Sequence, residues 1–143
     1  GVLEFTTGTY GQEICVDSII KGNEWIDENE TCWIWRSYGM EVMDGQIVYR
    51  NVLNLMQDDG TYLVFLNSNQ LNQYRTEKEF QTASEYFGYL PIEGAKVQPI
   101  KENQRNVLYK EWSEIPVFIS SEKVAAAWNE IAEMLLNKFE PDA

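Results

Sequence analysis

The chain has 143 residues, the usual size of one domain, and a formal net charge of −12 from 23 acidic and 11 basic residues. Phosphate recognition needs clustered Lys and Arg, so this balance excludes nucleic acids and anionic membranes as partners. Aromatic residues make up 13% of the chain and provide the large side chains of one core. We therefore expect residues 1–143 to form a single monomeric domain without a cofactor, a metal or a transmembrane segment.

Two strands are predicted in the first third of the chain. Tyr10 to Ile20 alternates apolar and polar residues and ends at Lys21-Gly22-Asn23, where the glycine permits a tight turn. Thr31 to Arg36 carries apolar bulk on both faces, with Trp33 and Trp35 on one of them. A strand with this pattern is either central in its sheet or covered on its second side.

Cys15 and Cys32 lie in these two predicted strands. In a hairpin, directly opposed residues share a face of the sheet. Pairing Ile14 with Ile34 builds one apolar face that includes Cys32, and it leaves Cys15 on the other face. We therefore expect two free thiols, with Cys32 in the core, and a disulfide is the alternative if the chain is secreted.

The strongest predicted strand is Tyr62 to Leu66, an aromatic and β-branched run that follows the turn Asp58-Asp59-Gly60. We expect it to lie at the centre of a sheet. Leu63 and Phe65 are predicted to share one face, and the other three side chains the opposite face.

Shorter strands are expected on both sides of it. Gln46 to Tyr49 predicts one before the turn, and residues 74–80 are too charged to assign. Ser84 to Leu90 and Lys96 to Ile100 predict two more, joined by a turn.

The C-terminal segment has a helical period instead. Apolar residues recur there at spacings of four, three and four, as Val124, Trp128, Ile131 and Leu135. This predicts an amphipathic helix over 124–139 with these side chains facing the core. Ser120 or Ser121 is expected to cap its first turn.

Short strands followed by a single helix favour a mainly β member of the α+β class. We expect a small antiparallel β-barrel or a curled sheet with a C-terminal amphipathic helix. Such a pattern excludes a doubly wound parallel sheet, which needs alternating strands and helices.

A pattern over residues 10–92 resembles a known group of proteins. It consists of Ile14 to Ile20 closing on Lys21-Gly22, then Cys32 to Arg36, then Tyr62 to Leu66. This layout resembles uncharacterised secreted and lipoprotein domains of Gram-positive bacteria. It is distantly similar to bacterial domains like the tissue inhibitors of metalloproteases, and that similarity implies a small OB-like barrel.

The resemblance implies an extracytoplasmic location, secreted or lipid-anchored. Because the chain opens Gly1-Val2 without an initiator Met, we also expect that a signal or anchor region before Gly1 is missing. The resemblance assigns no functional residue. The inhibitor family places a cysteine at its mature N-terminus, whereas this chain begins Gly1-Val2-Leu3, so metalloprotease inhibition is not implied.

The sequence disfavours an enzyme, and we assign no catalytic or metal-ligating residue. The chain has no histidine and no nucleophile-elbow motif, so a Ser or Cys nucleophile would need another base. Asp58-Asp59-Gly60 lacks the alternating acids of a calcium loop and is interpreted as a turn. A carbohydrate hydrolase with two facing carboxylates is the alternative, because the chain has many acids.

Aromatic side chains are the best candidates for ligand binding. We favour core packing for Trp33 and Trp35, beneath the terminal helix and against Trp128. The predicted ligand-binding residues are Trp25, Tyr38 and Trp112.

Exposed tryptophan marks contact surfaces more often than other residue types do. We therefore predict a non-catalytic extracytoplasmic module that binds a protein or a cell-envelope ligand. An acidic immunity or inhibitor protein that covers a basic partner is a further alternative.

Overall fold

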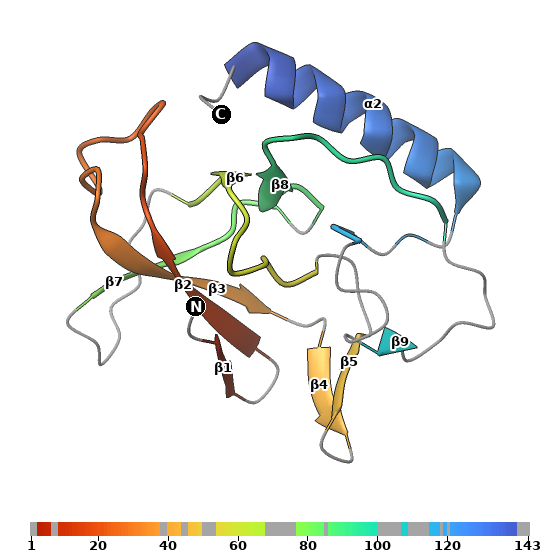
Figure 1. The fold of residues 1–143 in the computed structure, drawn as a ribbon, viewed down its shortest axis with the longest axis horizontal. Helices are drawn as coiled ribbons and strands as arrows, with labels where there is room; N and C mark the ends of the chain where they lie inside the picture. Colours follow the sequence, from red (N-terminus) through yellow and green to blue (C-terminus); the bar gives the residue numbers. More distant parts are fainter. Residues whose placement is uncertain are drawn as a thin grey trace.

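The structure is a computed structural model, and it describes residues 3–6, 9–37, 40–43, 46–49, 54–67, 77–84, 86–99, 107–108, 115–117, 119 and 121–139. These residues contain nine strands and one helix (Figure 1). The first five strands are β1 (Leu3–Thr6), β2 (Thr9–Cys15), β3 (Thr31–Ser37), β4 (Met40–Met43) and β5 (Gln46–Tyr49). They are followed by β6 (Tyr62–Val64), β7 (Lys78–Gln81), β8 (Tyr89–Pro91), β9 (Val107–Leu108) and the helix α2 (Glu122–Phe139).

The strands form three open sheets. The largest has the order β1-β2-β3-β7, the second β4-β5-β9, and the third pairs β6 with β8. The α+β class and the C-terminal helix are confirmed. Among the described strands no sheet closes into a barrel, and the expectation of a wholly antiparallel sheet is wrong because β7 runs parallel to β3.

The sequence left the segment of residues 74–80 unassigned, and most of the strand β7 lies in this segment. Lys78 and Glu79 made this segment look too charged for a strand, yet only 2% of Glu79 is exposed and Phe80 is equally buried. Glu79 lies directly beside Trp33 in the parallel pairing with β3. The sequence did not predict this strand because one of its buried residues, Glu79, is charged.

The β6–β8 pair lies between α2 and the four-stranded sheet (Figure 1). Leu63 and Phe65 pack in the cluster beneath α2, and Tyr62, Val64 and Leu66 pack toward Ile34 of the large sheet. The predicted division of faces is therefore confirmed.

The prediction that this segment is a five-residue strand is wrong in length, because the strand β6 has only three residues. β6 ends at Val64 and pairs only with β8 among the described strands. The predicted central position holds for the end of the segment, because Leu66 forms an isolated antiparallel bridge with Thr82 on the side away from β8. The side chains are apolar in both directions because a layer covers each face.

Helix α2 is capped where the sequence predicted, and it begins two residues before the predicted Val124. The hydroxyl oxygen of Ser121 accepts a hydrogen bond from the Val124 N–H at 3.3 Å, so Ser121 is the N-cap. The buried face carries Ala125, Trp128 and Ala132. Val124 and Ile131 are exposed, so this half of the predicted apolar stripe is wrong.

Small residues explain the rotation of the helix. Two of the three buried residues on α2 are alanines, which let the helix approach the β6–β8 layer closely. Trp128 then reaches past them, stacks on Phe87 at a centroid distance of 5.4 Å, and donates its indole N–H to the Tyr86 carbonyl oxygen. Leu135, Leu136 and Phe139 complete this face.

Trp33 and Trp35 do not meet Trp128. They stack on each other, with centroids 6.1 Å apart, on the face of the large sheet turned away from β6. Core packing of Trp33 is confirmed, since 3% of it is exposed. A Cβ at Gly11 would lie 2.9 Å from the Trp35 ring, so this ring requires glycine on the neighbouring strand.

Two of the predicted strands are shorter or absent. Only Tyr89–Pro91 of the segment from Ser84 forms a strand, and residues 96–99 form none. Residues 96–99 form no strand because the side chain of Asn129 binds both backbone groups of Val97. The Asn129 amide accepts a hydrogen bond from the Val97 N–H at 2.8 Å and donates one to the Val97 carbonyl at 3.2 Å. This replaces strand pairing at that residue. The short strand Gln46–Tyr49 is confirmed as β5.

The β2–β3 register determines on which face of the sheet each cysteine lies. Ile14 lies opposite Cys32 and Cys15 opposite Thr31, so the predicted faces are right although the register differs by two residues. Both cysteines are free thiols, with Cys15 exposed and Cys32 buried. Burial and the nearby carboxylate of Glu30 raise the pKa of Cys32 to about 12. β2 ends at Cys15, before the predicted Ile20.

Within the described part of the chain, no helix is both long enough and apolar enough to cross a bilayer.

Leu90 lies in the cluster beneath α2 and is almost fully buried. Leu90→Ala should therefore lower the free energy of unfolding by about 2–5 kcal/mol. Ile131→Ala, on the exposed side of α2, should change it by less than about 0.5 kcal/mol. Urea denaturation measures both. Similar losses for the two variants would contradict the order of the layers.

The two thiols should differ in reactivity. In the native protein at pH 8 we expect a thiol-specific disulfide reagent to label Cys15 rapidly and Cys32 very slowly, because the thiolate is the reacting form. Denaturation without reductant should expose two thiols, and Cys15→Ser should remove the rapid phase. A single thiol, or none, in the denatured protein would show that the assigned register is wrong.

Candidate functional site

The connection between β2 and β3, residues 16–30, is here called the acidic loop, because it contains five acidic residues and one lysine. It projects from the large sheet at the upper left of Figure 1. Backbone hydrogen bonds close its base: the Val16 N–H donates to the Glu30 carbonyl at 3.0 Å, and the Asn29 N–H donates to the Val16 carbonyl at 2.6 Å. The loop therefore leaves and rejoins the sheet at one fixed point.

A tight turn places Trp25. The Trp25 N–H donates to the Gly22 carbonyl at 3.0 Å, and Gly22 has a φ of +101°, which glycine adopts without steric cost. The turn predicted at Gly22 is thus confirmed. Asn29 has a φ of +65°, in the left-handed region that asparagine tolerates better than most residues.

Glu30 joins the loop to the sheet. Its carboxylate accepts the Asp27 N–H at 3.0 Å and pairs with the Lys78 ammonium of β7 at 3.2 Å. The backbone hydrogen bond from Asp27 is the main cause of the lowered pKa of Glu30, and Lys78 adds to it. The second half of the loop is therefore held against β7 by one side chain.

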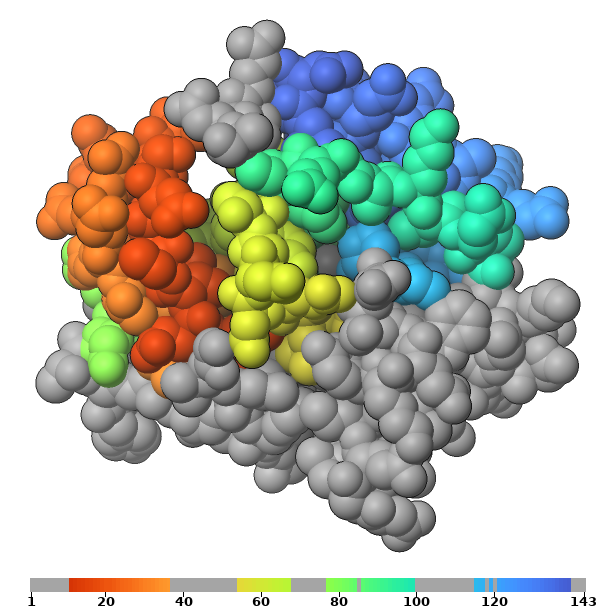
Figure 2. Space-filling model, in the orientation of Figure 1, coloured from red at the N-terminus to blue at the C-terminus, as the bar shows by residue number. Residues whose placement is uncertain are grey.

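The acidic loop presents apolar side chains to solvent. Ile20 is 52% exposed and Trp25 39% exposed. Four acidic residues of the loop are exposed as well, namely Asp17, Glu24, Asp27 and Glu28. The loop lies within the orange surface at the left edge of the molecule (Figure 2). This arrangement suits contact with an apolar depression that has basic residues at its rim.

Of the three predicted ligand-binding residues, Trp25 is exposed as expected. Tyr38 and Trp112 lie outside the described residues. The exposure of Trp25 agrees with the expectation, and its role in ligand binding stays a prediction. Ile20 was missed, because its place at the end of an apolar alternation indicated a strand.

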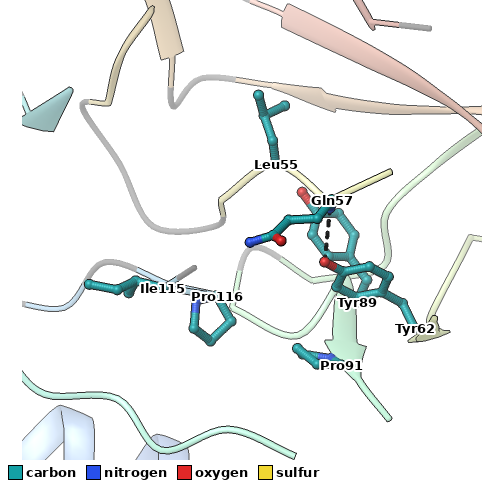
Figure 3. Close-up of a pocket in the computed structure, with 7 residues that line it drawn as sticks. All are labelled: Leu55, Gln57, Tyr62, Tyr89, Pro91, Ile115 and Pro116. Atoms are coloured by element: carbon teal, nitrogen blue, oxygen red, sulfur yellow. Dashed lines mark hydrogen bonds between the residues drawn. The ribbon is translucent and has the colours of Figure 1, made fainter. Parts of the chain in front are cut away.

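A cavity among the described residues, drawn in Figure 3, is too small for an organic ligand. It holds about 20 Å³, enough for one water molecule. Its lining consists of Leu55, Gln57, Tyr62, Tyr89, Pro91, Ile115 and Pro116.

Both tyrosine hydroxyls in the cavity already have partners. The Tyr62 oxygen accepts the Gln57 N–H at 2.9 Å, and the Tyr89 hydroxyl donates to the Asn54 carbonyl. These residues are part of the packing between layers, because Asn54 itself is fully buried and donates its amide to the Ile115 carbonyl at 2.6 Å.

Catalytic carboxylates are not brought together at this cavity, whose described lining contains no acidic side chain. Glu79 is buried beside Trp33 rather than in a cleft. Among the described residues, no group of three or more His, Cys, Asp or Glu side chains is placed to hold a metal ion.

The Glu30 contacts predict a pH dependence. A lowered pKa means that Glu30 stabilises the fold above its unfolded pKa, about 4.3, and that this contribution is lost as the pH falls through the folded pKa. Glu30→Gln should therefore be less stable than wild type at pH 7, with the difference shrinking below about pH 4. Urea denaturation between pH 3 and pH 7 measures it. The matched control is Glu28→Gln, and an unchanged pH profile in Glu30→Gln would contradict the assigned contacts.

No family model, curated protein or solved structure matches this chain. The resemblance to secreted bacterial domains therefore stays a prediction.

Proposed function

We propose that this chain is a non-catalytic module that binds a protein ligand through the acidic loop. The observation that carries the proposal is the exposure of Ile20 and Trp25 on a loop whose base is held by hydrogen bonds and an ion pair. Tryptophan is enriched among the residues that dominate binding energy. A loop that is already ordered loses little conformational freedom on binding.

The charges around Trp25 favour a basic partner. Asp17, Glu24, Asp27 and Glu28 are exposed on the same loop, against the single Lys21. A chain with a net charge of −12 attracts a cationic surface from a distance and speeds the encounter with it. This observation also favours the second candidate function, an immunity or inhibitor protein that covers the active surface of a basic protein.

An extracytoplasmic location belongs to the same proposal. It rests on the strand pattern of residues 10–92, including Lys21-Gly22 and Tyr62 to Leu66. A cell-envelope ligand is less well supported than a protein, because the exposed apolar residues sit on a projecting loop and the described cavity admits only about one water molecule.

The partner can be identified by site-specific crosslinking in the organism that produces the protein. A photoreactive phenylalanine analogue replaces Trp25, and the control carries the same analogue at Asn137, an exposed position on α2. We expect one crosslinked protein that is specific to position 25 and has a basic surface. Identical products from both positions would contradict binding by the acidic loop.

With that partner purified, Trp25→Ala should weaken binding by about 30-fold or more, the usual effect of losing a central tryptophan. Glu24→Gln and Glu28→Gln should mainly slow association and reduce its dependence on salt. Trp25→Ala should leave the free energy of unfolding within about 0.5 kcal/mol of wild type. Calorimetric titration, stopped-flow association and urea denaturation measure these three effects. Wild-type affinity in Trp25→Ala would overturn the proposal.

A further inference from the structure

The last residues of the acidic loop and the first residue of β3 form the tripeptide Asn29-Glu30-Thr31, here called the acceptor motif. It is the one place in the chain where an asparagine is followed two positions later by Ser or Thr with no proline between them. Oligosaccharides are attached to the asparagine side chain of extracytoplasmic proteins at this pattern. An acceptor asparagine must lie at the surface, because the enzyme that modifies it has to reach its amide.

Asn29 meets this requirement. Its side chain is exposed, and it belongs to the acidic loop, which projects from the large sheet in Figure 1. Its φ of +65° and the hydrogen bond from its N–H to the Val16 carbonyl fix a turn just before β3. The Asn29 side-chain amide makes no hydrogen bond within the described part of the chain. Its nitrogen is therefore accessible and not engaged.

The other two residues of the acceptor motif leave this amide accessible. The Glu30 carboxylate accepts the Asp27 N–H and joins the loop to β7, so it is engaged by groups other than the Asn29 amide. Thr31 is half-buried and lies opposite Cys15, which is exposed. Paired residues share a face of the sheet, so the Thr31 hydroxyl lies on the face where Cys15 is exposed.

The turn alone does not account for the whole motif. A positive φ selects asparagine or glycine at position 29, but it places no demand on the residue two positions later. The Thr31 side chain also makes no hydrogen bond to the described residues. The amide and the hydroxyl that define the motif are thus both left unused by the fold.

We propose that Asn29 is a site of N-glycosylation. The donor is an oligosaccharide joined through a diphosphate to a polyprenyl lipid. A bond forms between Nδ2 of Asn29 and the anomeric carbon of the first sugar, and the bond from that carbon to the diphosphate oxygen breaks. The lipid diphosphate leaves with the electron pair, and the amide proton passes to a base on the transferase. This site rests on the extracytoplasmic location proposed above, where such transfer takes place, and it does not depend on binding by the acidic loop.

Peptide mass spectrometry of the protein purified from the organism that produces it tests this proposal. Trypsin releases residues 22–36, which contain both the acceptor motif and Asn23. We expect this peptide to carry the mass of an oligosaccharide, with fragment ions that place it on Asn29 and not on Asn23. Thr31→Val keeps the β-branched shape without the hydroxyl and should abolish the added mass, whereas Thr31→Ser should retain it.

Asn29→Gly keeps the turn and removes the acceptor, so it should also abolish the added mass while leaving the midpoint of urea denaturation unchanged. The matched control, Asn23→Gln, should keep the oligosaccharide. Unmodified Asn29 in protein from the extracytoplasmic fraction would overturn the proposal, and so would an added mass that survives in Thr31→Val. Protein found only in the cytoplasm would overturn the proposed location together with this site. The crosslinking test at Trp25 reports on loop binding separately, whichever result is obtained.

Discussion

Side-chain amides hold the layers of this fold together where strand pairing does not reach. Gln12 donates to the Met56 carbonyl and accepts the Met56 N–H, both at 2.9 Å, and so joins β2 to the segment before β6. Asn54 joins the same segment to Ile115. Asn129 of α2 binds both backbone groups of Val97. Buried backbone groups must find partners, and here three amide side chains supply them.

This arrangement explains how small open sheets form one packed unit. The pair of β6 and β8 has too few strands to be stable alone, but it lies between a helix and a larger sheet and buries side chains in both directions. Tyr62 and Tyr89 contact each other edge to face, and their hydroxyls bond to the backbone of residues 54–57. Apolar burial and amide pairing therefore act on the same segments.

The acidic loop and helix α2 are supported differently. The acidic loop is fixed mainly by local backbone contacts and by Glu30, so its shape depends on a few polar interactions at its base. Helix α2 is fixed by the burial of Ala125, Trp128 and Ala132. The acidic loop presents apolar groups bordered by acids, which is consistent with a cationic partner.

The sequence alone determined features that depend on local periodicity and local geometry. Alternation in Tyr62 to Leu66 predicted its two faces, Ser121 was one of two predicted caps for α2, and Gly22 predicted the turn that presents Trp25. The alternation of side chains between the two faces of β2 and β3 predicted two free thiols. A register shift of two residues does not change these faces.

Tertiary structure decided which of several equivalent patterns is buried. Helix α2 has two apolar stripes, and its sequence does not distinguish them; packing selected the one with Ala125 and Ala132 because small residues let the helix approach the layer beneath it. The charge of Glu79 is typical of a surface residue, yet the pairing of β7 with β3 buries its side chain. Burial depends on what covers a face, and the covering residues lie far away in the sequence.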